Sequence, residues 1–173
     1  SIQWPIKRVT AYYREGEEEL LKANIAAMGQ QSPVVVMKVD DVYWGIDGLH
    51  RCQAAIERGD ELVPCVVREG TAAESMMANL VLNNLRGHTK ASEQVEVLGE
   101  LFDNLGVSIE ELVERTAHSR DWVERMLIVS RAPAFIRQAL DDELFTLGHA
   151  FALARMENKD DQERVYHQLL MYR

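Results

Sequence analysis

The sequence contains few residues of the kinds that cross-link a chain or anchor it in a membrane. Only two of its 173 residues are cysteine and four are proline. Cys52 and Cys65 are too few and too far apart for a zinc cluster, so we expect reduced thiols in a cytoplasmic protein. No apolar run reaches the roughly 18 residues of a membrane helix and no signal peptide opens the chain, so we expect no membrane contact.

Positive charge is also scarce. The chain has 19 Lys and Arg against 28 Asp and Glu, which gives a net charge of −9. Residues 1–87 carry 9 basic and 12 acidic groups (net −3), and residues 88–173 carry 10 and 16 (net −6). Because binding to nucleic-acid phosphates depends on Lys and Arg, this charge excludes a broad nucleic-acid-coating surface. Any contact with DNA must come from a local patch.

The first half of the chain alternates between strand and helix patterns. On the helix predicted from residue 17, one apolar stripe is formed by Leu20, Leu21, Ile25 and Met28. Strands are predicted at residues 6–9, 33–39, 42–46 and 62–68, and helices at 17–28, 49–58 and 72–85.

The second half contains helix patterns only. Thr89 is predicted to cap a helix that runs to Leu105, and Ser108 with Glu111 forms a capping box for the next helix. Further helices are predicted to start at or near Ser119, Pro133, Thr146 and Asp160. We therefore expect an α+β fold, with a small mixed-sheet domain over residues 1–87 and an all-helical domain over residues 88–173.

The stretch "YWGIDGLHR", residues 43–51, places charged groups where a strand passes into a helix. The free N–H groups and the dipole of a helix start attract phosphate, and Gly48 lets a ligand approach the backbone. Arg51 can bind phosphate oxygens in a bidentate way, and His50 adds a donor. A glycine turn with Arg51 paired to Glu57 or Asp47 on the surface fits the same pattern, so spacing alone leaves both interpretations open.

The stretch "SIEELVERTAHSRDWVERMLIVSRAP" has the spacing of a helix-turn-helix at about residues 108–130. Its second helix, from Arg120 to Ser130, would enter the major groove with its first residues. The candidate DNA contacts are Ser119, Arg120, Asp121, Trp122 and Arg125. Residues 108–131 hold four Arg against five acids, and an αα-hairpin used only for packing would give the same pattern.

Three segments together resemble the ParB/sulfiredoxin superfamily: "DGLHRCQAA", "LVPCVV" and "LVLNNLRG". The resemblance is best to the N-terminal domain of ParB partition proteins, in which a Gly-Glu-Arg-Arg segment binds the triphosphate of CTP. Gly48 and Arg51 match its glycine and second arginine, with Leu49 and His50 between them. The resemblance implies that these four residues bind nucleotide phosphates. Leu49 stands where sulfiredoxins carry their catalytic cysteine, which argues against sulfiredoxin chemistry.

The second matching segment is "NLVLNNLRGHT", where ParB proteins carry Glu-Asn-Ile-Gln-Arg near the magnesium of the nucleotide. Asn84 matches the amide and Asn83 replaces the glutamate, whereas Arg86 and His88 are expected to face phosphate or to decorate a helix end. Because Mg²⁺ prefers carboxylates, its binding is in question, with Asn84 and Asp47 as candidate ligands. Asp47 is also the candidate catalytic residue for what would be at most a slow triphosphatase (CTPase).

Two classes of function follow from these features. The leading hypothesis is a ParB-like homodimer that binds double-stranded DNA under the control of a nucleotide, with CTP expected, in plasmid or chromosome partition or in transcriptional regulation. The alternative is an enzyme, either a small-molecule kinase that resembles free-serine kinases or a nucleotide hydrolase, with Asp47 or Glu57 as the base. The appended helical half counts against an enzyme, and no clustered carboxylates support a nuclease.

Overall fold

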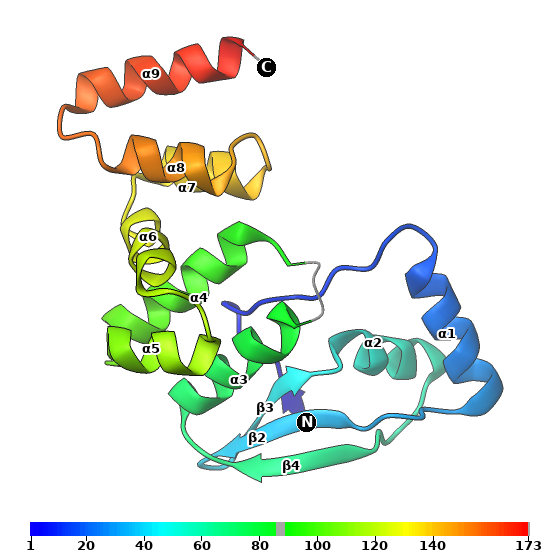
Figure 1. The fold of residues 1–173 in the computed structure, drawn as a ribbon. Coiled ribbons are helices and arrows are strands. Elements are labelled where there is room, and N and C mark those ends of the chain that lie inside the picture. Colours follow the sequence, from blue (N-terminus) through cyan, green and yellow to red (C-terminus); the bar gives the residue numbers. More distant parts are fainter. Residues whose placement is uncertain (86–88, 173) are drawn as a thin grey trace. The chain divides into compact units, whose positions relative to one another are not determined.

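The computed structural model describes residues 1–85 and 89–172, and it divides into two compact units, Ser1–Thr89 and Lys90–Arg173. The first unit contains a four-stranded sheet in the order β1-β3-β2-β4 (Figure 1). Its strands are β1 (Ile2–Gln3), β2 (Val34–Val39), β3 (Val42–Asp47) and β4 (Cys65–Glu69). The hairpin β2–β3 is antiparallel, whereas β1 pairs parallel to β3 and β4 parallel to β2, so the sheet is mixed as expected.

Three helices accompany this sheet. They are α1 (Glu17–Met28), α2 (Leu49–Arg58) and α3 (Ala72–Asn84). Helix α3 begins with a capping box between Thr71 and Glu74 and packs on β2 and β3, while α2 packs on β2 and on α1. Fully buried side chains from β2, β3 and α3 fill the space between them, among them Val36, Ile46 and Leu80. Burial of this apolar surface fixes the ends of β3 and α2, where the candidate phosphate site lies.

Two sequence-based expectations for this unit were wrong. The apolar run at residues 6–9 is not a strand, and Ile6 is 98% exposed. The first strand is the two-residue β1 instead, which is too short to produce a periodic pattern. Trp4 follows it and lies against Gly45, where a Cβ would come within 2.6 Å of the Trp4 ring. The stripe on α1 is not a core face either, because only Ile25 of that helix is buried.

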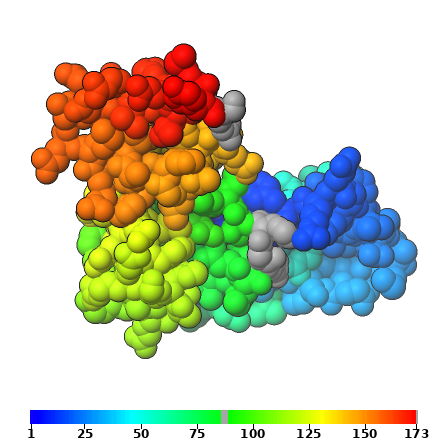
Figure 2. Space-filling view, turned by 45° about the horizontal axis from the view of Figure 1, so that its top comes forward, coloured from blue at the N-terminus to red at the C-terminus, as the bar shows by residue number. Residues whose placement is uncertain are grey.

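The second unit is helical throughout residues 90–172. Its helices are α4 (Ala91–Asp103), α5 (Ile109–Thr116), α6 (Arg120–Ser130), α7 (Ala134–Asp141), α8 (Leu147–Ala154) and α9 (Lys159–Met171). Helices α4 and α6 approach closely at Gly99, where a Cβ would lie 2.8 Å from the Cβ of Ser130. Helices α8 and α9, orange to red in Figure 2, pack against each other. The expected α+β fold is confirmed.

One predicted cap in this unit was wrong. Helix α4 has Lys90 at its N-cap, without a side-chain cap hydrogen bond, so Thr89 is not the capping residue. The other predicted starts hold: Ser108 accepts from the Glu111 N–H, which is one of the two bonds of the predicted capping box, and Ser119 accepts from the Trp122 N–H. Hydroxyl caps next to an apolar periodic segment are strong local signals, but they fix a helix boundary only to within one or two residues, and α4 begins one residue later than predicted.

Candidate functional site

The N-terminus of α2 is set by one glycine. Strand β3 ends at Asp47, and Gly48 then turns the chain with φ 102°, in the left-handed region, before α2 begins at Leu49. A side chain at position 48 would be strained, and its Cβ would lie 3.0 Å from Nη2 of Arg51. Glycine is therefore required both for the turn and for the approach of Arg51.

A cavity of about 260 Å³ lies over this helix start. Most of its walls come from three segments of the first unit: residues 8–13, residues 46–51, and Asn79 with Asn83 on α3. Trp4 and Glu17 complete the lining. All four residues that sequence analysis assigned to phosphate here, from Gly48 to Arg51, line the same cavity. Asp47 lines it as well, so the site is assembled around the end of β3.

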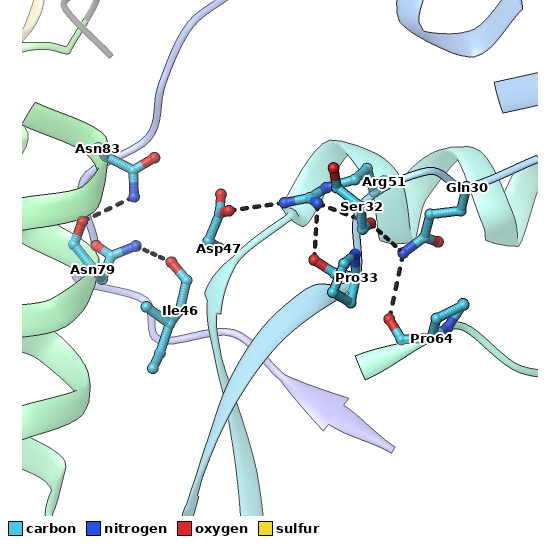
Figure 3. A network of polar contacts seen from close by, with 9 residues as sticks. All are labelled: Gln30, Ser32, Pro33, Ile46, Asp47, Arg51, Pro64, Asn79 and Asn83. Carbon is cyan, nitrogen blue, oxygen red and sulfur yellow. Dashed lines mark hydrogen bonds and ion pairs between the residues drawn. The ribbon is translucent and has the colours of Figure 1, made fainter. Parts of the chain in front are cut away.

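Arg51 is held on both sides of its guanidinium (Figure 3). Its Nη1 donates to the carbonyl oxygens of Ser32 at 2.9 Å and Pro33 at 2.8 Å, and its Nη2 pairs with Oδ2 of Asp47 at 2.8 Å. The two paired side chains are 14% and 9% exposed, so this is not the surface pair considered from the sequence. Glu57, the other acid considered, pairs with Lys22 instead.

A second cavity of about 610 Å³ lies on the other side of Arg51. It is lined by the loop of residues 28–33 and by part of α1, and it shares three residues with the first cavity: Tyr13, Asp47 and Arg51. In the loop, Gln30 donates through Nε2 to the Ser32 carbonyl at 2.9 Å. Arg51 thus links the loop to α2 by hydrogen bonds and lines both the smaller and the larger cavity.

His50 contacts a different segment, residues 11–13. Its Nε2 lies 3.2 Å from the carbonyl oxygen of Ala11, and its ring meets Tyr13 edge-on at 4.6 Å. Because a carbonyl can only accept, Nε2 carries the proton. The other nitrogen, Nδ1, is buried without a hydrogen-bond partner among the described residues. It accepts in neutral imidazole and donates in imidazolium, so it is available to a ligand in either state.

Two cavity residues were missed by sequence analysis. Arg8 lines the cavity, and its Nε is buried without a partner among the described residues while Nη1 donates to the Pro5 carbonyl. Asn79 accepts from the Val9 N–H at 2.7 Å and donates to the Ile46 carbonyl at 2.9 Å, which joins three segments. A polar residue four positions before Asn83 on an apolar helix is the signal that could have found Asn79; nothing local marks Arg8.

Of the residues predicted from the second sequence segment, Asn83 lies at this cavity. Asn83 is 5% exposed, lines the cavity, and donates to the Asn79 carbonyl at 2.9 Å. Its side chain and that of Asp47 face each other in Figure 3. Asn84 is not among the described lining residues, and Arg86 and His88 lie outside the residues that the structure describes.

A metal ion has little to bind here. Residues 1–85 and 89–172 contain no group of three His, Cys, Asp or Glu side chains placed to hold one. Asp47 is the carboxylate nearest to the helix start, and Arg51 already neutralises its charge. A magnesium ion would therefore need phosphate oxygens of a ligand to complete its shell.

The helix-turn-helix forms as predicted in the second unit. Helix α5 ends at Thr116, Ala117 turns the chain with φ 56°, and Ser119 caps α6. Trp122 stacks on His118 with ring centroids 3.8 Å apart, and burial lowers the pKa of His118. The buried face of α6 includes Val123, Met126 and Leu127. Two candidate residues, Ser119 and Trp122, thus already have structural roles within the motif.

The two candidate arginines of α6 lie on its exposed face, each beside an acid. Arg120 pairs with Glu110 of α5 and with Glu124, and its hydrogen bond lowers the pKa of Glu110. Arg125 pairs with Asp121 at 2.8 Å. A phosphate that binds either arginine must compete with these carboxylates, which weakens indiscriminate binding to polyanions.

Among the described helices, none combines the length and the hydrophobicity that a membrane span requires.

Among solved structures, the chain is similar to the C-terminally truncated chromosome-partitioning protein ParB from Caulobacter crescentus, crystallised in complex with the centromeric parS site. The TM-score is 0.62 with 21% identity, over 98% of this chain and 88% of that chain.

Curated relatives come from several bacteria. The chain is 31% identical over 149 residues to the chromosome-partitioning protein Spo0J of Thermus thermophilus, which covers 85% of this chain and 55% of that protein. It is 30% identical over 145 residues to a probable chromosome-partitioning protein ParB of Coxiella burnetii (84% and 50%). It is 27% identical over 160 residues to a nucleoid occlusion protein of Oceanobacillus iheyensis (91% and 56%). The chain thus spans about half the length of these relatives.

Family models match both units. The model of the ParB N-terminal domain matches residues 5–85, and the model of the ParB HTH domain matches residues 89–172. Together they account for the mixed sheet with its cavity at α2 and for the helices around the helix-turn-helix. The chain therefore belongs to the ParB family.

Proposed function

We propose that this protein binds double-stranded DNA through its helix-turn-helix and is regulated by a nucleoside triphosphate, with CTP as the expected nucleotide, in chromosome or plasmid partition. The observation that carries the nucleotide half is the pair of cavities that meet at Arg51. The DNA half is supported by the helix-turn-helix and by the relatives, which are partition and nucleoid occlusion proteins, one of them solved with parS DNA.

The smaller cavity suits the triphosphate. It combines a helix start that follows a left-handed glycine with the side chains of two arginines and a histidine, Arg8, Arg51 and His50. Two of these keep a buried nitrogen without a partner among the described residues, so they have hydrogen-bonding capacity left for an anion. Such a concentration of donors in a protein of net charge −9 favours a compact, highly charged anion.

The larger cavity suits the rest of the nucleotide. Its lining is more apolar, with Leu21, Ile25 and Met28 from α1, and it includes the amide side chains of Gln30 and Gln31. Amides present both donors and acceptors, as a base edge requires. Arg51 lines both cavities and is bonded to Asp47 and to the carbonyls of Ser32 and Pro33. We therefore expect a ligand that occupies both cavities to replace some of these bonds of Arg51.

The kinase alternative is not supported. Asp47, its candidate base, is held by Arg51, and Glu57 pairs with Lys22 at 3.1 Å. With Asn83 in place of an acid in the cavity wall, we propose that triphosphate hydrolysis is slow or absent, and that Mg²⁺ binds mainly through the phosphates. Regulation would then come from nucleotide binding itself, by a shift toward a conformation or a homodimer that the nucleotide prefers.

The first experiment is a calorimetric titration of the purified protein with CTP, ATP, GTP and UTP, each with and without Mg²⁺. We expect one of the four, CTP, to bind at least tenfold more tightly than the others, a difference of about 1.4 kcal/mol. Equal binding of all four would limit the site to triphosphate recognition. Absence of binding by any nucleotide would refute the nucleotide half of the proposal.

A further inference from the structure

A pair of arginines from two helices shares one aromatic ring beside the helix-turn-helix. The guanidinium carbon of Arg125, on α6, lies 5.0 Å from the ring centroid of Phe151, on α8. Arg155, at the C-terminal cap of α8, lies 5.4 Å from the same centroid. Helices α6 and α8 pack against each other within the second unit, so the exposed face of α6 continues onto α8 at this ring.

Arg155 differs from the arginines of the helix-turn-helix in its electrostatic surroundings. Each of those arginines has an acidic partner: Arg115 has Glu111, Arg120 has Glu110 and Glu124, Arg125 has Asp121, and Arg131 has Asp103. Arg155 makes no ion pair with any residue in the described ranges 1–85 and 89–172; its contact is with the face of Phe151. A cation that is not already paired with a carboxylate has more to gain from a phosphate than one that must first lose such a partner.

We propose that the DNA-binding surface extends from α6 onto α8, and that Arg155, oriented by Phe151, binds a backbone phosphate next to the one bound by Arg125. This inference rests on the proposed DNA binding. Stacking on a ring holds the planar guanidinium in one orientation while its N–H groups stay free for oxygen atoms, which reduces the entropy lost on binding. The same ring serves Arg125, so the two charges are presented together.

Arg155 lies outside the recognition helix, at the end of α8 rather than at the start of α6. It is therefore assigned to the backbone, where contacts fix the position of the protein on the duplex without reading sequence. Such a contact also adds affinity at a lower cost. The arginines of α6 must first break their ion pairs with Glu110 and Asp121 before they can bind a phosphate. Because the protein is acidic overall, the contribution of this unpaired arginine to the salt dependence of binding should be measurable.

The test compares Arg155→Ala with Lys159→Ala in the full chain. Lys159 starts α9, is exposed, and makes no ion pair with a described residue, so its loss removes one charge from the same unit without the ring contact. Binding to duplex fragments is measured by fluorescence anisotropy at two salt concentrations. We expect Arg155→Ala to weaken binding by about five- to tenfold on every fragment and to lower the salt slope by about one. Lys159→Ala should stay within about twofold of the parent.

A third variant separates charge from structure. Arg155→Lys keeps the charge and should restore the salt slope, although not the full affinity, because an ammonium lacks the planar fork. If the parent binds DNA and Arg155→Ala equals Lys159→Ala, the inference fails while the proposed function stands. If the parent binds no fragment at any salt concentration, both fail. If Arg155→Ala loses binding to an acidic peptide or heparin but not to duplex DNA, the partner of this surface is not DNA.

Discussion

At the scale of single residues, Arg51 combines structural contacts with a position at the proposed nucleotide site. It bonds the loop of residues 28–33 through two carbonyls and neutralises the buried carboxylate of Asp47. These bonds hold the guanidinium at the junction of two cavities, where a triphosphate would meet it. A ligand that takes over one of these bonds also changes how the loop is held, which links binding to conformation.

Replacement of this residue by Arg51→Ala should therefore have two effects. Triphosphate affinity should fall by about 1.5–3 kcal/mol, the size of a charge-assisted hydrogen bond. Stability should fall by about 3–5 kcal/mol, because the buried carboxylate of Asp47 loses its ion pair with Arg51. Calorimetry measures the first and thermal unfolding the second, with Arg58→Ala at the other end of α2 as control, since Arg58 pairs only with Asp60 among described residues. An unchanged affinity in the folded variant would remove Arg51 from the nucleotide site.

At the scale of elements, the turn of the helix-turn-helix contains a titratable ring. His118 stacks on Trp122, and burial lowers its pKa below the usual value near 6.5. The unfolded chain therefore binds a proton at a higher pH than the folded one. The stability contributed by neutral His118 is complete above about pH 6.5 and decreases as the pH falls from there toward the folded-state pKa.

We accordingly expect the urea concentration at the unfolding midpoint to decrease when the pH is lowered from 7.5 to 5.5. The decrease should be smaller in His118→Gln. Other groups titrate in this range too, so the informative quantity is the difference between parent and variant at the two pH values. His167→Gln is the matched control, because that imidazole lies exposed on α9, whereas His149 accepts the Thr146 N–H in the capping box of α8. A pH dependence that is the same in the parent and in His118→Gln would contradict this account of the turn.

The two exposed arginines of α6 should behave differently on DNA. Arg120 starts the helix, where base edges are reached, so Arg120→Ala should cost about 1–3 kcal/mol, mainly on the preferred site. Arg125 lies a turn later beside Phe151, so Arg125→Ala should weaken all fragments equally and lower the salt slope by about one. Titrations of both variants on specific and random duplexes separate the two patterns. If each variant loses the same affinity on specific as on random duplexes, neither residue reads bases.

How far the sequence predicted these elements depends on how local their causes are. Helix α6 has a hydroxyl cap and an apolar period within a few residues, and its bounds were predicted correctly. Strand β1 has two residues and depends on pairing with β3, some 40 residues later, so no local pattern marks it. The run from Gly48 to Arg51 was singled out from local spacing and from the family resemblance, and its four residues line one cavity. The carbonyls of Ala11, Ser32 and Pro33 that position His50 and Arg51 come from distant loops and were not found.

At the scale of the whole molecule, the two proposed activities lie in two separate units. The cavities proposed for the nucleotide belong to residues 1–89, and the helix-turn-helix with its proposed extension to Arg155 belongs to residues 90–173. Because the net charge is −9, the proposed DNA-binding patch must be small, and sequence-independent binding should be weak at physiological salt. A nucleotide that changes DNA retention would have to act from the first unit on the second.

Nucleotide control of DNA binding is tested by measuring the retention of genomic DNA fragments by the full chain with and without CTP, in parallel with Arg51→Ala and the Arg58→Ala control. We expect the parent to retain a small set of fragments and CTP to change this retention. Arg51→Ala should respond to CTP at least tenfold less than the parent or Arg58→Ala, as expected for a loss of about 1.4 kcal/mol or more. Retention that is identical with and without CTP in all three proteins would contradict nucleotide control, and retention of no fragment under either condition would contradict DNA binding itself.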